Sequence, residues 1–225
     1  MLNKVKQFIQ EQELITANSS IICAVSGGVD SVCLLHILYQ LGYSVILAHV
    51  NHHKRSQSIL EQKAMEELAK KYNIPFELLE YYDTGKENFQ SEAHHARYEF
   101  FKKLAIKYNT SYIATAHHLE DQAETILMRL ISGSNLYGYA GISIKKQEGA
   151  FEFIRPLLCV SKEEIYAYAK KNHLLYFEDA SNASDDYLRN RIRHHILPIL
   201  QKENKSYLHK FQEFSIQAKD SFDFI

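Results

Sequence analysis

A short apolar run at residues 21–25 passes directly into the sequence SGGVDS at residues 26–31. An unbroken run of branched and small apolar residues predicts a buried strand of a parallel sheet, which the two glycines end in a tight turn. From Val32 the apolar side chains recur at helical spacing until Gly42, where we expect the helix to stop. The chain therefore has to build a strand–loop–helix unit with the loop at the carboxyl end of the strand.

The loop at residues 26–31 has the composition of a phosphate-binding turn. Gly27 and Gly28 let the backbone approach a ligand, and the free amides at the helix start favour an anion. Ser26 and Ser31 add hydroxyl donors, while Asp30 offers a carboxylate that could hold a magnesium ion against the phosphates. The loop has neither the Walker sequence nor the Gly-x-Gly-x-x-Gly fingerprint, so the alternative is an ordinary glycine-rich turn.

The remaining periodicity predicts an α/β fold with a doubly wound, mostly parallel sheet flanked by helices. Apolar runs typical of further strands lie at residues 43–50, 75–81, 112–115, 151–154 and 174–177. A chain of 225 residues is long enough for one such core. We expect a catalytic domain over residues 1–200, followed by a helical linker or the start of a truncated C-terminal region at 201–225.

Charge and cysteine usage exclude several classes of protein. The formal net charge is −1, which argues against a generally basic nucleic-acid coat. The N-terminus does not resemble a signal peptide and no segment is long enough to span a bilayer, so we expect a cytoplasmic protein without membrane contact. Cys23, Cys33 and Cys159 are widely spaced in apolar surroundings, which predicts buried thiols rather than a zinc site or an iron–sulfur cluster.

Polar residues follow the second predicted strand and open a later helix. His49 and Asn51 come at the carboxyl end of the strand, where they could contact an adenine or ribose, although such a turn is often only a solvated loop. Arg97 lies in the first turns of a helix predicted to run from residue 91 to about residue 108. The alternative for Arg97 is a surface salt bridge.

The richest group of titratable residues follows the fourth predicted strand. His117 and His118 precede Asp121 and Glu124, whose spacing of three at the start of a helix places both carboxylates on one face. Such a group could orient an amine, hold a metal or manage a proton. Helix capping is the alternative for one of the acids and does not account for all four residues.

A basic cluster follows near the C-terminal end. Arg189 and Arg193 share a helix face because they are four residues apart, whereas Arg191 points elsewhere. Guanidinium groups suit carboxylates and phosphates, which predicts a substrate clamp or a nucleic-acid contact. A solvated charged face is the alternative.

The order of these motifs resembles the tRNA(Ile)-lysidine synthase family, which belongs to the N-type ATP pyrophosphatases with a PP-loop. The first motif is shared by many adenylating enzymes, and the later motifs are far more specific. The matching residues are 26–31, 49–52, Glu92, Ala96-Arg97, 115–118, 121–125, 155–157, Asp179, Ser181-Asn182 and Arg189-Asn190-Arg191. Glu120 departs from the pattern, because relatives often carry aspartate there.

The resemblance implies a reaction in two steps. ATP adenylates the ring carbonyl oxygen of the wobble cytidine in a CAU anticodon, and the ε-amine of free lysine then displaces AMP to leave lysidine. The implied co-substrate is ATP with Mg²⁺, and the implied partners are tRNA(Ile) and L-lysine, with room for a homodimer.

The resemblance also implies roles for individual residues. The loop would bind ATP through Ser26, Gly27, Gly28, Val29, Asp30 and Ser31, with Asp30 holding the metal. Asp121 and Glu124 would hold the lysine amine or organise the cytosine site, and His117 would assist adenylation. Arg97, Arg189 and Arg191 would face carboxylate or phosphate, with Arg189 counted among the catalytic residues.

Three other interpretations stay open. A tRNA thiolase shares the loop but normally needs paired cysteines, which this sequence lacks. An ammonia-using synthetase of the NAD or GMP type would not be expected to carry the later motifs. The third interpretation is a nucleotide-binding or tRNA-binding module without catalysis.

Overall fold

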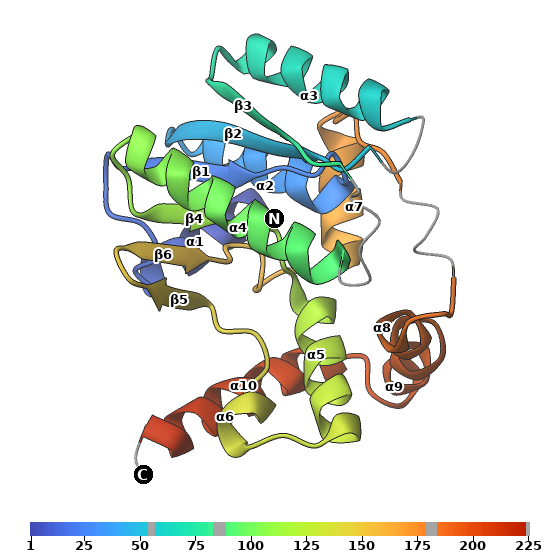
Figure 1. Cartoon of the computed structure of the whole chain (residues 1–225). Coiled ribbons are helices and arrows are strands. Elements are labelled where there is room, and N and C mark those ends of the chain that lie inside the picture. The colour runs from blue at the N-terminus through green and yellow to red at the C-terminus, as the bar shows by residue number, and fades with distance from the viewer. Residues whose placement is uncertain (54–56, 83–88, 179–183, 224–225) are drawn as a thin grey trace.

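The computed structural model describes residues 1–53, 57–82, 89–178 and 184–223, and it contains a six-stranded sheet between layers of helices (Figure 1). The strands are β1 Ser20–Ala24, β2 Ser44–Asn51, β3 Phe76–Glu80, β4 Tyr112–Ala114, β5 Lys145–Glu148 and β6 Phe151–Ile154. Their order in the sheet is β3-β2-β1-β4-β6-β5. All neighbours are parallel except β5, which pairs antiparallel with β6 at one edge. The structure therefore confirms the predicted doubly wound, mostly parallel fold.

Helices connect the strands and cover the sheet. They are α1 Leu2–Glu11, α2 Val29–Gln40, α3 Ser58–Tyr72, α4 Phe89–Lys107, α5 Leu119–Ser132, α6 Leu136–Tyr139, α7 Lys162–Lys171, α8 Leu188–Arg191, the π-helix η2 Ile192–Ile196, α9 Leu197–Glu203 and α10 Tyr207–Asp223. From β1 the chain winds outward to β2 and β3, and then returns past β1 to β4 on its other side. The strand order thus reverses between β1 and β4, which creates a crevice at their carboxyl ends.

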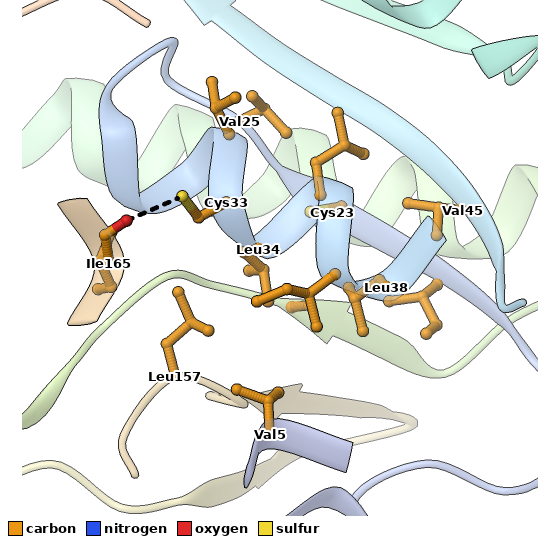
Figure 2. Close-up of a cluster of buried hydrophobic side chains, with 14 of the residues drawn as sticks. Val5, Cys23, Val25, Cys33, Leu34, Leu38, Val45, Leu157 and Ile165 are labelled. Carbon is orange, nitrogen blue, oxygen red and sulfur yellow. Dashed lines mark hydrogen bonds between the residues drawn. The ribbon is translucent and has the colours of Figure 1, made fainter. Parts of the chain in front are cut away.

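Alternating side chains along the central strands build two cores on opposite faces of the sheet. Ile21 and Cys23 join a large core with residues from α1, α2, α3 and α7, part of which Figure 2 shows. Ile22 points to the other face, where it packs with Phe101 and Leu104 of α4. In Figure 1 α4 covers that face. The three cysteines are buried and free, as the sequence predicted.

Helix α7 is fixed at its start and along its length. Ser161 accepts a hydrogen bond from the Glu164 amide at 3.2 Å, and Glu164 Oε2 accepts one from the Ser161 amide at 2.9 Å, so the capping box exists. Lys4 of α1 donates to both Glu164 carboxylate oxygens at 2.9 Å. The Cys33 thiol of α2 lies 3.6 Å from the Ile165 carbonyl oxygen (Figure 2). These contacts give the first residue of α7 a defined position.

The C-terminal helices form a layer of their own with α5, below the sheet in Figure 1. Its core contains Ala123, Ile192, Leu197 and Tyr207. Gln122 joins α5 to α10 because its amide nitrogen donates to Ser215 at 2.6 Å, while its amide oxygen accepts the Ile142 amide at 2.6 Å. Helix α10 is thus packed against the structure, and the predicted domain boundary at residue 200 stays a prediction.

The prediction of a strand at residues 174–177 was wrong. The described chain there has no regular secondary structure, and the Phe177 amide donates to the Gly27 carbonyl oxygen at 3.0 Å. The reason is that β5, which was not predicted, already occupies the sheet edge next to β6. Phe177 instead lies against the loop at residues 26–31. Among the described helices, none is both long and apolar enough to cross a membrane.

Gly141 offers a test of the junction around Gln122. Its φ is +75°, and an added Cβ would lie 2.6 Å from the Gln122 amide oxygen, which the Ile142 hydrogen bond holds in place. Gly149 has a φ of +61° with nothing within 4 Å of such a Cβ. We expect Gly149→Ala to lower the free energy of unfolding by about 1 kcal/mol from backbone strain alone. Gly141→Ala should cost about 1–3 kcal/mol more, because it also overpacks the junction.

Urea denaturation of both variants measures this difference. An equal loss of stability in the two would show that the contact with Gln122 relaxes freely.

Candidate active site

A cavity of about 880 Å³ opens at the carboxyl ends of β1, β2 and β4, where the strand order reverses. Residues from five separate stretches of the chain line it, which is the expected place for a ligand in a doubly wound sheet. The predicted site residues that line it are Ser26, Asp30, Ser31, His49, Asn51, Arg97, His117, Asp121 and Arg189. The structure therefore brings together most of the residues that the sequence singled out, from positions far apart in the chain.

The phosphate-binding loop is held by its own hydroxyl groups. Ser31 Oγ donates to the Gly28 carbonyl oxygen at 2.9 Å and accepts the Ser26 amide at 3.1 Å. Gly27 has a φ of +93°, a backbone conformation that residues other than glycine rarely adopt. Val29 is buried in the core, so only its backbone can serve a ligand. The loop thus presents Ser26, Asp30 and the start of α2 to the cavity in a fixed arrangement.

The two predicted residues after β2 are buried and already hydrogen-bonded. His49 Nδ1 donates to the Val25 carbonyl oxygen at 2.7 Å, and burial lowers the pKa of the ring. The Asn51 amide nitrogen donates to Gln62 at 2.7 Å, and its oxygen accepts the His53 amide at 2.9 Å. Asn51 therefore holds the turn after β2. Because Nδ1 of His49 is used in the hydrogen bond to Val25, Nε2 is the ring nitrogen left for a further hydrogen bond.

Arg97 on α4 forms part of the opposite wall of the cavity. Its guanidinium carbon lies 5.8 Å from the centre of the Tyr98 ring, and Tyr98 stacks on His94 at 4.4 Å. Within the described residues Arg97 makes no ion pair, so the surface salt bridge considered from the sequence is absent from that part of the chain. A cationic fork beside aromatic rings suits an anionic group attached to a planar base.

The adjacent histidines after β4 have opposite protonation preferences. Burial lowers the pKa of His117 to about 4, with Arg155 and Arg189 adding to the effect against Asp121. His118 is also buried, but the carboxylates of Asp121, Glu120 and Asp30 outweigh that burial and raise its pKa. His118 Nε2 lies 3.5 Å from Asp121 and 3.9 Å from Asp30. His117 is therefore neutral near pH 7, and His118 is the favoured carrier of a proton.

Asp121 stays ionised at the cavity wall. Burial would raise its pKa, but His118, His117 and Arg189 lower it, as does the His118 amide, which donates to its carboxylate at 3.0 Å. This hydrogen bond makes Asp121 a cap of α5, so the capping alternative is part of the arrangement. A buried carboxylate that keeps its charge can bind a cationic amine.

Glu124 lies behind the cavity wall rather than in it. Its side chain is completely buried, and its oxygens accept hydrogen bonds from Arg193 Nε at 2.6 Å and Arg193 Nη2 at 2.9 Å. Arg189 Nε is 3.7 Å from the same carboxylate, and Arg189 Nη2 donates to Thr125 at 3.0 Å. Burial raises the pKa of Glu124 despite Arg193. The geometry makes Glu124 a residue that positions two arginines, because it holds Arg193 with both oxygens and lies beside Arg189.

The arginine cluster divides as its spacing predicted. Arg189 and Arg193 face α5, while Arg191 is exposed and donates to the carbonyl oxygens of Asp185 at 2.9 Å and Asp186 at 3.0 Å. The structure does not bring Arg191 to the cavity, because its side chain closes the turn before α8. Arg193 was missing from the predicted site, although its spacing of four from Arg189 was the signal. Asp179, Ser181 and Asn182 lie outside the described residues.

Lys162 is the residue that sequence reasoning missed entirely. Its ammonium group lies 2.7 Å from both carboxylate oxygens of Asp30, and its backbone amide donates to Glu120 at 2.9 and 3.1 Å. The sequence held no local signal, because Asp30 and Lys162 are 132 positions apart. Glu120 Oε2 is shared between two partners, because His118 Nδ1 also lies 2.9 Å from it.

The oxygen-bearing side chains around Asp30 fit a magnesium ion that is coordinated mainly by the phosphates of a bound substrate. Mg²⁺ commonly binds through one or two carboxylates together with substrate phosphates, and Asp30 supplies one carboxylate beside the loop hydroxyls. Among the described residues no group of three or more acidic, histidine or cysteine side chains forms a metal site independent of a ligand. The ammonium of Lys162 shows that this carboxylate favours a cation.

Comparison with known proteins identifies the class. The family model of the PP-loop domain matches residues 1–200, and the chain belongs to this family. It is 38% identical over 221 residues to a tRNA(Ile)-lysidine synthase from Enterococcus faecalis and 37% identical over 238 residues to one from Geobacillus kaustophilus. These alignments cover 96% and 100% of this chain, but the chain spans only 48% and 51% of the two relatives.

Solved structures support the fold. A U34-tRNA thiolase from Methanococcus maripaludis superposes with a TM-score of 0.80 at 18% identity, over 97% of this chain and 77% of that one. An NH3-dependent NAD synthetase from Campylobacter jejuni gives a TM-score of 0.54 at 15% identity, over 99% and 93% of the two chains. The two proteins show that this sheet and its helices form a shared architecture.

The buried environment of His117 predicts a dependence of stability on pH. An unfolded histidine takes up a proton near its ordinary pKa of 6.5, whereas folded His117 does so only near 4. The free energy of unfolding should therefore fall by about 1–3 kcal/mol as the pH drops from 6.5 toward 4, and this contribution vanishes above 6.5. His117→Gln should make the loss smaller by that amount, whereas His209→Gln, on the exposed face of α10, should leave it intact.

Urea denaturation at several pH values between 4.5 and 7.5 provides the measurement. Identical pH profiles for wild type and His117→Gln would contradict the burial argument.

Proposed function

We propose that this chain carries the catalytic part of a tRNA(Ile)-lysidine synthase. ATP would adenylate the carbonyl oxygen of the wobble cytidine in a CAU anticodon with loss of pyrophosphate, and the ε-amine of lysine would then displace AMP. The observation that carries the proposal is the convergence of the PP-loop, Asp121 and Arg189 on one cavity. Identity of 37–38% to two tRNA(Ile)-lysidine synthases over nearly the whole chain supports the same substrate class.

The nucleotide end of the cavity supports the first step. Membership of the PP-loop family implies ATP, and the loop amides with Ser26 and Ser31 would bind its phosphates. We propose that Asp30 holds Mg²⁺, which would offset the charge that builds on the leaving pyrophosphate. His49 would contact the adenine or ribose through Nε2. Arg97 and Arg189 would bind phosphate groups of the nucleotide or of the tRNA.

The second step needs a neutral amine from a lysine that arrives as an ammonium ion. Asp121 keeps its charge and would bind that ammonium, while neutral His117 beside it can accept a hydrogen bond. Glu124 lies behind the cavity wall with both oxygens bound to Arg193, so we assign it to the positioning of Arg193 and of Arg189 beside it. The proposal for Glu124 is thus narrower than the one from the resemblance.

Further parts of the proposal come from the family resemblance. They are tRNA(Ile) and free L-lysine as partners, a homodimer, and a cytoplasmic location. Other classes of enzyme with this loop are less well supported: each cysteine is buried in the core, and none lines the cavity in the described structure, so a thiolase would lack its sulfur ligand there.

The release of AMP tests the function. We expect AMP formation from ATP to require both lysine and a tRNA with a CAU anticodon, and mass spectrometry of the digested tRNA should find lysidine at the wobble position. A tRNA(Ile) transcript with a GAU anticodon is the control and should give no product. AMP release with ammonia or a small molecule in place of tRNA would contradict the proposal, and binding of tRNA without turnover would favour a module without catalysis.

Two arginines on α8 provide a matched pair for the site. Arg189 lines the cavity, whereas Arg191 is exposed and donates to the backbone carbonyls of Asp185 and Asp186, six and five residues earlier in the chain. We expect Arg189→Ala to lower kcat/KM for AMP formation by about 100-fold, because it removes a charged contact to the reacting groups. Arg191→Ala should change it by less than about threefold. Steady-state kinetics of both variants decide, and an equal loss in the two would remove Arg189 from the site.

A further inference from the structure

A second cavity of about 370 Å³ lies close to the first, because Lys162 in its lining forms an ion pair with Asp30 in the lining of the first. Its lining includes His118, Glu120, Lys162, Tyr166 and Arg193. Asp30 lines the larger cavity, and Lys162 reaches it from the side of the smaller one. The Asp30–Lys162 ion pair therefore lies at the boundary between the two cavities.

The position of Lys162 is set by other contacts. It is the first residue of α7, and Glu120 accepts its backbone amide with both carboxylate oxygens at 2.9 and 3.1 Å. Its ammonium also lies 5.2 Å from the centre of the Tyr166 ring. The backbone of Lys162 is therefore fixed, while its four-carbon side chain stays able to turn.

The ammonium occupies the place that a metal ion needs. Both Asp30 oxygens lie 2.7 Å from Nζ, so neither is open for direct coordination while the pair is closed. We infer that Lys162 is a tethered counter-ion that holds Asp30 while the nucleotide site is empty and that yields this carboxylate to the divalent cation that enters with ATP. Lys162 is thus a positioning residue that acts through Asp30. This inference rests only on the nucleotide-binding part of the proposed function.

The exchange is energetically accessible. The side chains of Asp30 and Lys162 are 28% and 32% exposed, so water screens the pair and it contributes modestly to stability. A divalent cation has twice the charge of the ammonium, so at equal distance it would attract the Asp30 carboxylate more strongly. After the exchange, Lys162 can turn toward the second cavity, which Glu120 and Tyr166 line. The pair is therefore weak enough to open.

Manganese binding tests the inference without catalysis. Electron paramagnetic resonance of free Mn²⁺ would measure its dissociation constant from the full chain saturated with a non-hydrolysable ATP analogue. We expect Lys162→Met to bind Mn²⁺ about fivefold more tightly than wild type, because the competing ion pair is gone. Lys162→Gln should act in the same direction. Lys162→Arg should stay near wild type, since a guanidinium can also hold both oxygens.

A control comes from an ion pair outside both cavities. Lys107 of α4 donates to Glu77 of β3 at 2.6 Å, so Lys107→Met removes an ion pair that does not touch α7 and should leave Mn²⁺ affinity unchanged. Asp30→Asn should abolish the protein contribution to Mn²⁺ binding. Thermal melts establish that each variant is folded.

These measurements distinguish the role of Lys162 from the existence of the nucleotide site. Unchanged or weaker Mn²⁺ binding by both Lys162→Met and Lys162→Gln, with wild type binding the analogue normally, would overturn the role of Lys162 and leave the proposed function intact. Failure of wild type to bind the analogue would instead overturn the nucleotide site itself and this inference with it.

Discussion

Parallel pairing of β1 on both of its edges is the constraint from which the site follows. Because β2 and β4 both run parallel to β1, each connection has to cross a face of the sheet before the next strand can pair. The chain leaves β1 toward β2 and later returns to β4 on the other side, so two loops separate at the carboxyl end of β1. The resulting crevice holds the phosphate-binding loop on one side and the acidic start of α5 on the other.

Charge pairing in this crevice explains how so many ionisable groups can be kept out of water. Three carboxylates have cationic partners: Asp30 pairs with Lys162 and Glu124 with Arg193, both from distant elements, while Asp121 pairs with His118 at the start of its own helix. Removing one partner of a buried pair leaves the other charge uncompensated, so the two partners of such a pair depend on each other for the site to stay folded. They differ in burial, because Glu124 is completely enclosed whereas Asp30 remains partly exposed. The pair of Glu124 with Arg193 is therefore suited to a structural role. In the partly exposed pair of Asp30 with Lys162, Asp30 can exchange the lysine for a ligand.

Much of the fold was predictable because its signals are local. The unbroken apolar run before the two glycines and the helical spacing after them each depend on neighbouring residues, and the structure contains both the strand and the helix. The expected strand at residues 174–177 failed, since an apolar run does not say which sheet edge is free. The antiparallel β5 occupies that edge, and its polar sequence gave no apolar signal.

The residue types and their spacing determined the phosphate-binding loop, the carboxylates of α5 and the split of the arginine cluster into two faces, because each is a property of a few adjacent turns. Only the tertiary structure decided which of these groups face the cavity. It turned Glu124 away toward Arg193 and left Arg191 on the surface. It also brought Lys162 to Asp30 across 132 positions, since the partner of a charge is chosen by the packing of α7 against α2 and not by proximity in the chain.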